Sequence, residues 1–226
     1  MKEFQWNNED NAEFYEKIPI KIFQHYAYMA GLDDYSDLVL IKEYIQKANS
    51  ILEVGAGYGR VLEYLINIGF KGDITAIERS KKFYGELKYR FKKNKINLIH
   101  ADIKHFQPKK KFDLILWLWS GICDFNKHEQ ISLIQHLSTL MNKLGTLIID
   151  SFPPGILLLN GVSNNNQESI ITLDGYQVFN YFPSTEEMNQ YGQVLKFNTV
   201  KCILFKTSKE RNRYFWIFKN TRPIGA

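Results

Sequence analysis

Residues 51–60 read ILEVGAGYGR, an apolar run that contains one acidic residue, Glu53, and is followed by three alternating glycines. The apolar run 51–54 predicts a buried strand, and the glycines predict a sharp turn into a helix. Amides at the start of such a helix favour an electron-rich ligand, which glycine lets the backbone approach closely. Glu53 would then lie at the carboxyl end of a strand, where open α/β sheets bind ligands. This stretch predicts the first strand–helix unit of an α/β fold and a ligand site at its turn.

The rest of the chain continues as short apolar runs alternating with longer amphipathic segments, the pattern of strand–helix units around a parallel sheet. The run 112–119 is nearly all apolar, as a strand buried on both faces must be, and marks the centre of the sheet. Two β-rich runs, 199–207 and 213–218, flank a polar turn and predict a terminal antiparallel hairpin. Before this hairpin, strands are predicted at 51–54, 73–78, 96–100, 112–119 and 145–150.

Helix starts and inward faces are predicted from caps and apolar spacing. Ser80 precedes a basic helix, and the segment 184–187 has the form of a capping box. The inward stripe of the basic helix is Phe83, Tyr84, Leu87 and Phe91, and that of the helix before the fifth strand is Ile131, Ile134, Leu137 and Met141.

Two segments lie outside the alternation and predict additions to the core. Residues 1–48 form an aromatic-rich helical leader, and the main domain is predicted to span 49–226. Residues 152–183 begin with a Pro-Pro-Gly run and an asparagine-rich turn at 164–166, so we expect an inserted loop and hairpin there. Both additions should flank the carboxyl edge of the sheet and act as a lid.

The composition limits the class of protein. Of the 226 residues, 45% are hydrophobic and 23% charged, the usual mix for one globular core. The first residues hold no apolar stretch of signal-peptide length, and no uncharged run of about 18 residues occurs, so we expect a cytoplasmic protein without a membrane partner. Cys123 and Cys202 lie far apart, and neither they nor the histidines show metal-ligand spacing, so we expect reduced thiols and no metal site.

The glycine spacing separates this turn from two better-known nucleotide loops. A dinucleotide fingerprint reads G-x-G-x-x-G, whereas this chain reads G-x-G-x-G with Arg60 in the sixth position, and the Gly-Lys-Ser/Thr of a phosphate loop is absent. Glu78 follows Gly59 by nineteen residues and ends the second predicted strand. A carboxylate at that position can accept both ribose hydroxyls of a nucleoside.

This combination of motifs resembles the class I S-adenosylmethionine-dependent methyltransferases, strongly over residues 50–150 and in outline to the C-terminus. The resemblance implies a Rossmann-like, seven-stranded, mostly parallel sheet with helices on both faces, S-adenosylmethionine as cofactor and S-adenosylhomocysteine as product. In that family the glycine loop holds the methionine part, and acidic residues after the second and third strands bind ribose and the adenine amino group. These roles fall on residues 53–59, Glu78 and Asp102.

The predicted site is a cofactor site in which no catalytic residue is assigned. Ala101 and Ile103 would flank the adenine ring, while Trp117 and Leu118 would face the sulphonium side. Asp124 and His128 follow the fourth strand, where a general base could lie, although either position also suits a cap or a solvent-facing residue. The full predicted set is Glu53, Gly55, Ala56, Gly57, Tyr58, Gly59, Glu78, Arg79, Ala101, Asp102, Ile103, Trp117 and Leu118.

The methyl acceptor is predicted only by class. The sequence after the fourth strand is Trp-Ser-Gly-Ile at 119–122, not the Asn/Asp-Pro-Pro-Tyr/Phe run of enzymes that methylate base or glutamine amino groups, and a small molecule is expected. Residues 81–111 hold eleven Lys or Arg against Glu86 and Asp102, which leaves an RNA methyltransferase as an alternative. A non-catalytic nucleotide-binding protein of this fold, or an NAD-binding oxidoreductase, is a further alternative.

Overall fold

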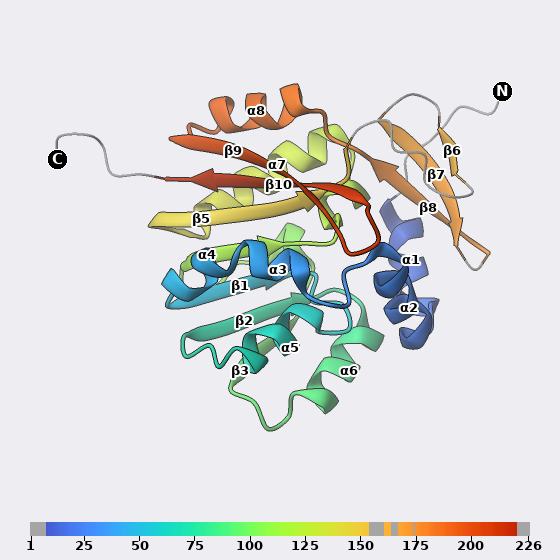
Figure 1. Cartoon of the computed structure of the whole chain (residues 1–226), viewed down its shortest axis with the longest axis horizontal. Coiled ribbons are helices and arrows are strands. Elements are labelled where there is room, and N and C mark those ends of the chain that lie inside the picture. Colours follow the sequence, from blue (N-terminus) through green and yellow to red (C-terminus); the bar gives the residue numbers. More distant parts are fainter. Residues whose placement is uncertain (1–7, 154–160, 164–166, 174, 221–226) are drawn as a thin grey trace.

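The computed structural model describes residues 8–153, 161–163, 167–173 and 175–220 (Figure 1). The glycine of the Pro-Pro-Gly run and the asparagine-rich turn at 164–166 lie outside the described residues.

A seven-stranded sheet forms the centre of the molecule, in the order β3-β2-β1-β4-β5-β10-β9. Strands β1 to β5 pair in parallel, and β10 runs antiparallel to both of its neighbours. The predicted α/β fold with a C-terminal antiparallel hairpin is therefore confirmed. The strands are β1 (Ser50–Val54), β2 (Asp73–Glu78), β3 (Ile96–His100), β4 (Phe112–Trp117), β5 (Met141–Ser151), β9 (Thr199–Lys206) and β10 (Asn212–Lys219).

Helices cover both faces of this sheet because each presents one apolar stripe to it. One face packs against α3, α4, α5 and α6, and the other against α7 and α8, through two separate apolar clusters. The helices are α3 (Ser36–Leu40), α4 (Lys42–Lys47), α5 (Arg60–Asn67), α6 (Lys81–Arg90), α7 (Lys127–Thr139) and α8 (Thr185–Val194). The predicted caps are present: the Ser80 hydroxyl accepts the Phe83 N–H, and Ser184 forms a capping box with Glu187.

Two predicted boundaries are wrong. Met141 does not belong to the helix before the fifth strand, since α7 ends at Thr139 and Met141 opens β5, paired with Phe112. An apolar residue four positions after Leu137 suits a helix face and a buried strand equally, so spacing alone could not separate them. The fourth strand ends at Trp117 rather than residue 119, because Trp119 turns out of the strand with a φ of 52°.

The first two leader helices, α1 (Asn8–Lys17) and α2 (Ile20–Ala30), lie with the insertion at the carboxyl end of the parallel strands, beside a small separate sheet (Figure 1). The rest of the predicted leader, α3 and α4, packs on a face of the main sheet instead. The second sheet contains the predicted hairpin, β7 (Glu168–Leu173) and β8 (Tyr176–Tyr181), and a third strand, β6 (Gly161–Ser163). The buried Asn11 side chain of α1 pairs with both the N–H and the C=O of Phe179 in β8, each over 2.8 Å. The Asn11 side chain thus links the leader to the insertion by hydrogen bonds.

A third apolar cluster joins the cap, which consists of α1, α2 and the β6–β8 sheet, to the core. It contains Phe14, Ile18 and Ala27 of the leader, packed with Tyr58, Phe83 and Val178. Because Tyr58 belongs to the glycine-rich turn and Val178 to β8, the cluster links the leader to both the turn and the second sheet. Among the described residues, no helix is long and apolar enough to cross a membrane.

Candidate active site

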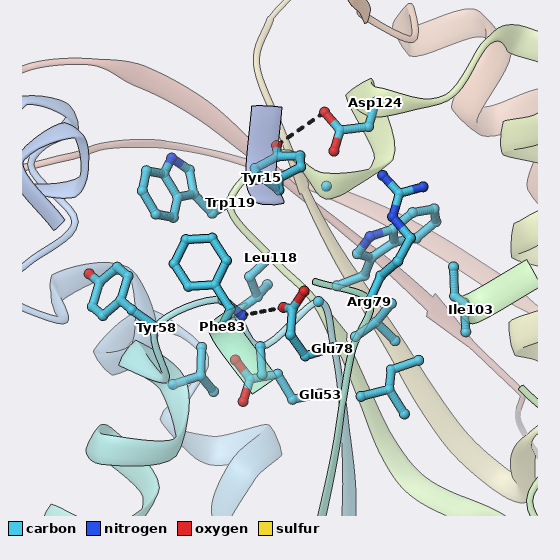
Figure 2. Close-up of a pocket in the computed structure, with 18 of the residues that line it drawn as sticks. Tyr15, Glu53, Tyr58, Glu78, Arg79, Phe83, Ile103, Leu118, Trp119 and Asp124 are labelled. Carbon is cyan, nitrogen blue, oxygen red and sulfur yellow. Dashed lines mark hydrogen bonds between the residues drawn. The ribbon is translucent and has the colours of Figure 1, made fainter. Parts of the chain in front are cut away.

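One pocket opens at the carboxyl ends of β1, β2 and β4, beneath the leader helices, and encloses about 980 Å³ including its solvent-open part (Figure 2). The predicted site residues that line it are Glu53, Gly55, Ala56, Gly57, Tyr58, Glu78, Arg79, Ala101, Asp102, Ile103, Trp117 and Leu118.

Gly59 does not line the pocket. Its φ of 89° and its surroundings explain the glycine by packing, since a Cβ there would lie 2.5 Å from Phe91 and 2.8 Å from Leu87. The third glycine of the turn therefore lets α6 pack closely against the start of α5.

Glu78 joins the end of β2 to the glycine-rich turn. Its carboxylate accepts the Gly57 N–H and the Ser80 N–H, each over 2.7 Å, and its C=O accepts the Ala101 N–H over 3.1 Å. Burial raises the pKa of Glu78, and the N–H donors of Ser80 and Gly57 oppose that shift by stabilising the charged form. The turn, the start of α6 and the residue after β3 are thereby all held by Glu78, the first two through its carboxylate and the last through its backbone C=O.

Glu53 is a buried carboxyl group, next to the turn, whose pKa is raised. Its side chain is buried at the end of β1, and this burial raises its pKa to about 8, against the opposing effect of the Arg60 charge. Within the described part of the chain, its Oε2 atom has no hydrogen-bond partner. A buried oxygen of this kind is costly and suits a ligand that donates a hydrogen bond.

Arg60, the residue that departs from the dinucleotide pattern, has a structural partner in the leader. Its guanidinium donates to both carboxylate oxygens of Asp37 over 2.7 Å, and to the Leu32 C=O over 2.9 Å. Both charged side chains are buried, so each compensates the charge of the other. The first turn of α5 is therefore anchored to α3.

The far end of the predicted site lies after β3. Asp102 accepts the N–H of Lys104 over 2.8 Å and faces the guanidinium of Arg79 at 3.6 Å. Ala101 and Ile103 line the pocket on either side of Asp102. Ala101 and Ile103, which are expected to flank an adenine ring, thus lie on either side of the acidic side chain expected to bind its amino group.

A buried ion pair that no sequence pattern predicts shapes the segment after β4. Asp150 and Arg213 are both fully buried and lie 2.7 Å apart. Asp150 also accepts the Trp119 N–H over 2.9 Å, and Arg213 donates to the Ser120 hydroxyl over 2.6 Å. These bonds hold Trp119 and Ser120 in the left-handed backbone region, at φ of 52° and 57°.

Aromatic side chains from the leader and the core form the wall above the glycine-rich turn. Phe23 of α2 stacks on Trp119 with ring centroids 4.5 Å apart, and it also contacts Tyr58 and Phe83. Sequence reasoning placed aromatic residues in the leader but did not assign Phe23, Phe83 or Trp119 to the site.

Asp124 also lines the pocket, although it was considered only as one of two possible bases. It ends a short 3₁₀ helix, η2 (Gly121–Asp124), where the Tyr15 hydroxyl and the Asn11 amide both donate to its Oδ1 atom over 3.3 Å. Removal from bulk water raises its pKa to about 7, against the lowering effects of Tyr15, Arg79 and Asn11. His128, the other candidate, is exposed on α7 and does not line the pocket.

Part of the sequence, and the fold as a whole, are similar to those of known methyltransferases. Residues 51–145 match the family model of a methyltransferase domain. No curated protein matches the sequence significantly. The fold is shared with the PH0226 protein of Pyrococcus horikoshii OT3, at a TM-score of 0.69 and 14% identity over 92% of this chain and 99% of that one.

Two solved methyltransferases show the same likeness of fold. Magnesium protoporphyrin IX methyltransferase from Synechocystis PCC 6803 with bound S-adenosylmethionine has a TM-score of 0.68 at 12% identity, over 98% of this chain and 100% of that one. An amino pentose methyltransferase from Micromonospora echinaspora with the same cofactor has a TM-score of 0.61 at 13% identity, over 98% and 100%. Residues 51–145 therefore match a methyltransferase domain, and the chain shares the fold of these solved S-adenosylmethionine-dependent methyltransferases, in agreement with the sequence resemblance.

Proposed function

We propose that this chain transfers the methyl group of S-adenosylmethionine to a small molecule enclosed between its core and its cap, the cap being α1, α2 and the β6–β8 sheet. The observation that carries this proposal is that the predicted cofactor residues and the aromatic leader residues line the same pocket. The two related methyltransferases act, by their descriptions, on a porphyrin and an amino pentose, which supports a small-molecule acceptor.

The cofactor would lie along the carboxyl ends of the first three strands. The amides of the turn and Glu53 suit the methionine part, Glu78 the ribose and Asp102 the adenine amino group. Glu78 already accepts two backbone N–H groups, so its carboxylate is fixed in orientation before it meets the ribose hydroxyls. Trp117 and Leu118, where β4 ends, would face the sulphonium.

The cofactor supplies a methyl group on a positively charged sulphur that is already a good leaving group. The chain's own contribution is to align the acceptor and exclude water, and positioning alone can provide roughly 7 to 11 kcal/mol of a reaction barrier. The aromatic wall and the cap suit both tasks, since they cover the turn with apolar side chains.

The RNA alternative receives less support from the contacts of the basic segment. Arg90 donates to the Tyr58 C=O and pairs with Glu63, and Lys104 pairs with Glu129, so these cations are engaged within the fold. Lys88, Lys92 and Lys93 are exposed, and they are the residues through which an RNA would be held.

Two measurements test the proposal. Calorimetry should show binding of S-adenosylmethionine and S-adenosylhomocysteine in the micromolar range, and no heat with either ligand but binding of NAD would overturn it. Screening of metabolites and RNA with methyl-labelled cofactor should then give transfer to a small molecule.

A triple variant tests the RNA alternative. Combined substitution of Lys88, Lys92 and Lys93 by Glu should leave this transfer unchanged, whereas a large, salt-dependent loss would favour an RNA acceptor.

A further inference from the structure

One carboxyl group of the pocket has no task in the proposed cofactor contacts. Glu53, Glu78 and Asp102 are assigned to the methionine part, the ribose and the adenine, and they come from the ends of β1, β2 and β3. Asp124 comes from the segment after β4, which the proposal places beside the sulphonium and its methyl group. A group at this position is suited to contact the acceptor.

The contacts of Asp124 tie it to the cap that would enclose an acceptor. Figure 2 shows the Tyr15 hydroxyl directed at Asp124, at the opposite end of the view from Glu53. Asn11 donates to the same oxygen as Tyr15, and its position is fixed by its two bonds to Phe179. The carboxyl group is therefore oriented by side chains of α1, which in turn is held by β8.

The charges of the pocket favour some acceptors over others. Four carboxyl groups line it, those of Glu53, Glu78, Asp102 and Asp124. Of the two lining arginines, Arg60 forms a bidentate pair with Asp37, and Arg79 faces Asp102. An acceptor that is itself a carboxylate or phosphate would meet the ionised form of Asp124, the form that takes a proton, at close range, which disfavours its binding.

We propose that Asp124 binds the reacting hydroxyl or amino group of a neutral small-molecule acceptor and takes its proton during methyl transfer. This inference rests on the proposed function and narrows its substrate class. A lone pair of the acceptor oxygen or nitrogen forms the new bond to the methyl carbon as the carbon–sulphur bond breaks. The electrons of that bond remain on sulphur, giving neutral S-adenosylhomocysteine, and the acceptor proton passes to the carboxylate of Asp124.

The electrostatic surroundings of Asp124 are compatible with this role. Its pKa of about 7 lies close to neutral pH, where a general base is most effective. The groups that face it are Tyr15 and Asn11 from α1 and Arg79 and Glu78 from the end of β2. Tyr15 keeps its proton, because burial and the neighbouring Asp124 charge raise its pKa well above the usual value, so it acts as a positioning donor.

The test uses three probes that share one aromatic ring, 4-methylphenol, 4-methylaniline and benzoate, with the protein saturated by S-adenosylhomocysteine. Ligand-detected NMR should show binding of the phenol and the amine, and at least tenfold weaker binding of benzoate. Asp124→Asn should weaken binding of the phenol and the amine about tenfold and leave affinity for S-adenosylhomocysteine within twofold. His128→Asn, which changes an exposed neighbour outside the pocket, serves as the matched control and should behave like the parent.

Transfer to the two bound probes from S-adenosylmethionine tests the proton-accepting step. Asp124→Asn should lower the transfer rate about 10² to 10⁴-fold and remove an inflection near pH 7 in the rate profile. Tyr15→Phe removes a hydrogen bond to the charged form of Asp124 and should move that inflection to higher pH.

Several results would overturn the inference. The parent chain could bind benzoate as tightly as the phenol and the amine, or bind none of the probes. Asp124→Asn could bind the probes as tightly as the parent chain does, or the parent chain could transfer a methyl group to neither bound probe. Loss of S-adenosylhomocysteine binding in Asp124→Asn would also overturn it, because Asp124 would then be a cofactor residue. Failure of the parent chain to bind S-adenosylmethionine would instead refute the proposed function on which the inference depends.

Discussion

The backbone N–H of Gly57 donates to Oε2 of Glu78 over 2.7 Å, so the carboxylate that ends β2 also holds the glycine-rich turn that follows β1. Its second oxygen, Oε1, accepts the Ser80 N–H at the start of α6. One buried side chain thus fixes the relative positions of two strand–helix units. Any change at Glu78 is therefore expected to affect both ligand binding and the local structure.

Glu78→Ala should weaken S-adenosylmethionine binding by roughly 1 to 3 kcal/mol, the scale of charge-assisted hydrogen bonds. Glu78→Gln should lie between the parent and the alanine variant, because an amide oxygen can still accept one of the two backbone N–H groups. Calorimetry measures the affinity, and thermal unfolding of the ligand-free protein separates the structural loss. If both variants bind like the parent, Glu78 does not contact the ribose.

Gly57→Val should abolish cofactor binding while the domain remains largely folded. Gly57 has a φ of 54°, which a β-branched residue rarely adopts, and a Cβ there would lie 3.4 Å from Phe23. Gly85→Ala is the matched control, since its added Cβ meets no described atom within 4 Å and it lies in helix α6. The control should stabilise the protein by up to about 1 kcal/mol without changing affinity. An unaltered affinity in Gly57→Val would show that the turn does not touch the ligand.

Glu53→Gln should alter stability in a pH-dependent way. Glutamate in an unfolded chain has a pKa of about 4.3, whereas burial raises the pKa of Glu53 to about 8 in the folded state. The folded state therefore binds more protons between these values, and the parent chain loses stability relative to Glu53→Gln as pH rises from about 4.3 to 8.

The difference in melting temperature between Glu53→Gln and the parent should thus grow over that range and level off above it, in the absence of ligand. The exposed Glu43→Gln substitution controls for the loss of one charge. The same Glu53 variant should bind S-adenosylmethionine more weakly, because it lacks the carboxylate that faces the cationic cofactor. A melting-temperature difference that is constant with pH would contradict the assigned pKa.

Deletion of residues 1–30 should leave a domain that binds cofactor but no longer transfers the methyl group to the acceptor, since the cap both aligns the acceptor and excludes water. Because the deletion also exposes the surface beneath Phe14 and Ile18, Asn11→Ala provides a milder test. It removes both bonds to Phe179 and should lower turnover more than cofactor affinity. Glu13→Gln, an exposed change on the same helix, is the control. Full acceptor turnover by both altered chains would remove the cap from the mechanism.

The acidic residues proposed to bind the cofactor could be found from the sequence because they lie at or next to strand ends. Glu53, Glu78 and Asp102 each follow an apolar run whose length and content predict a buried strand, and parallel strands bring their carboxyl ends to one edge. The packing around Gly59 could not be predicted in this way, because the side chains that a Cβ there would meet, Leu87 and Phe91, lie in and just after a helix distant in sequence.

The sequence by itself determined the alternation of strands and helices, the glycine-rich turn and the acidic residues beside it, since these depend on local periodicity and backbone conformation. Only the tertiary structure decided which side chains meet across long separations. Tyr15 reaches Asp124, and Asp150 pairs with Arg213, through contacts between segments 109 and 63 residues apart. Such partners leave no local pattern, because their identity depends on how the cap and the terminal hairpin pack against the sheet. The arrangement of Asp124 and Trp119 in the pocket depends on these contacts, so it became visible only in the folded chain.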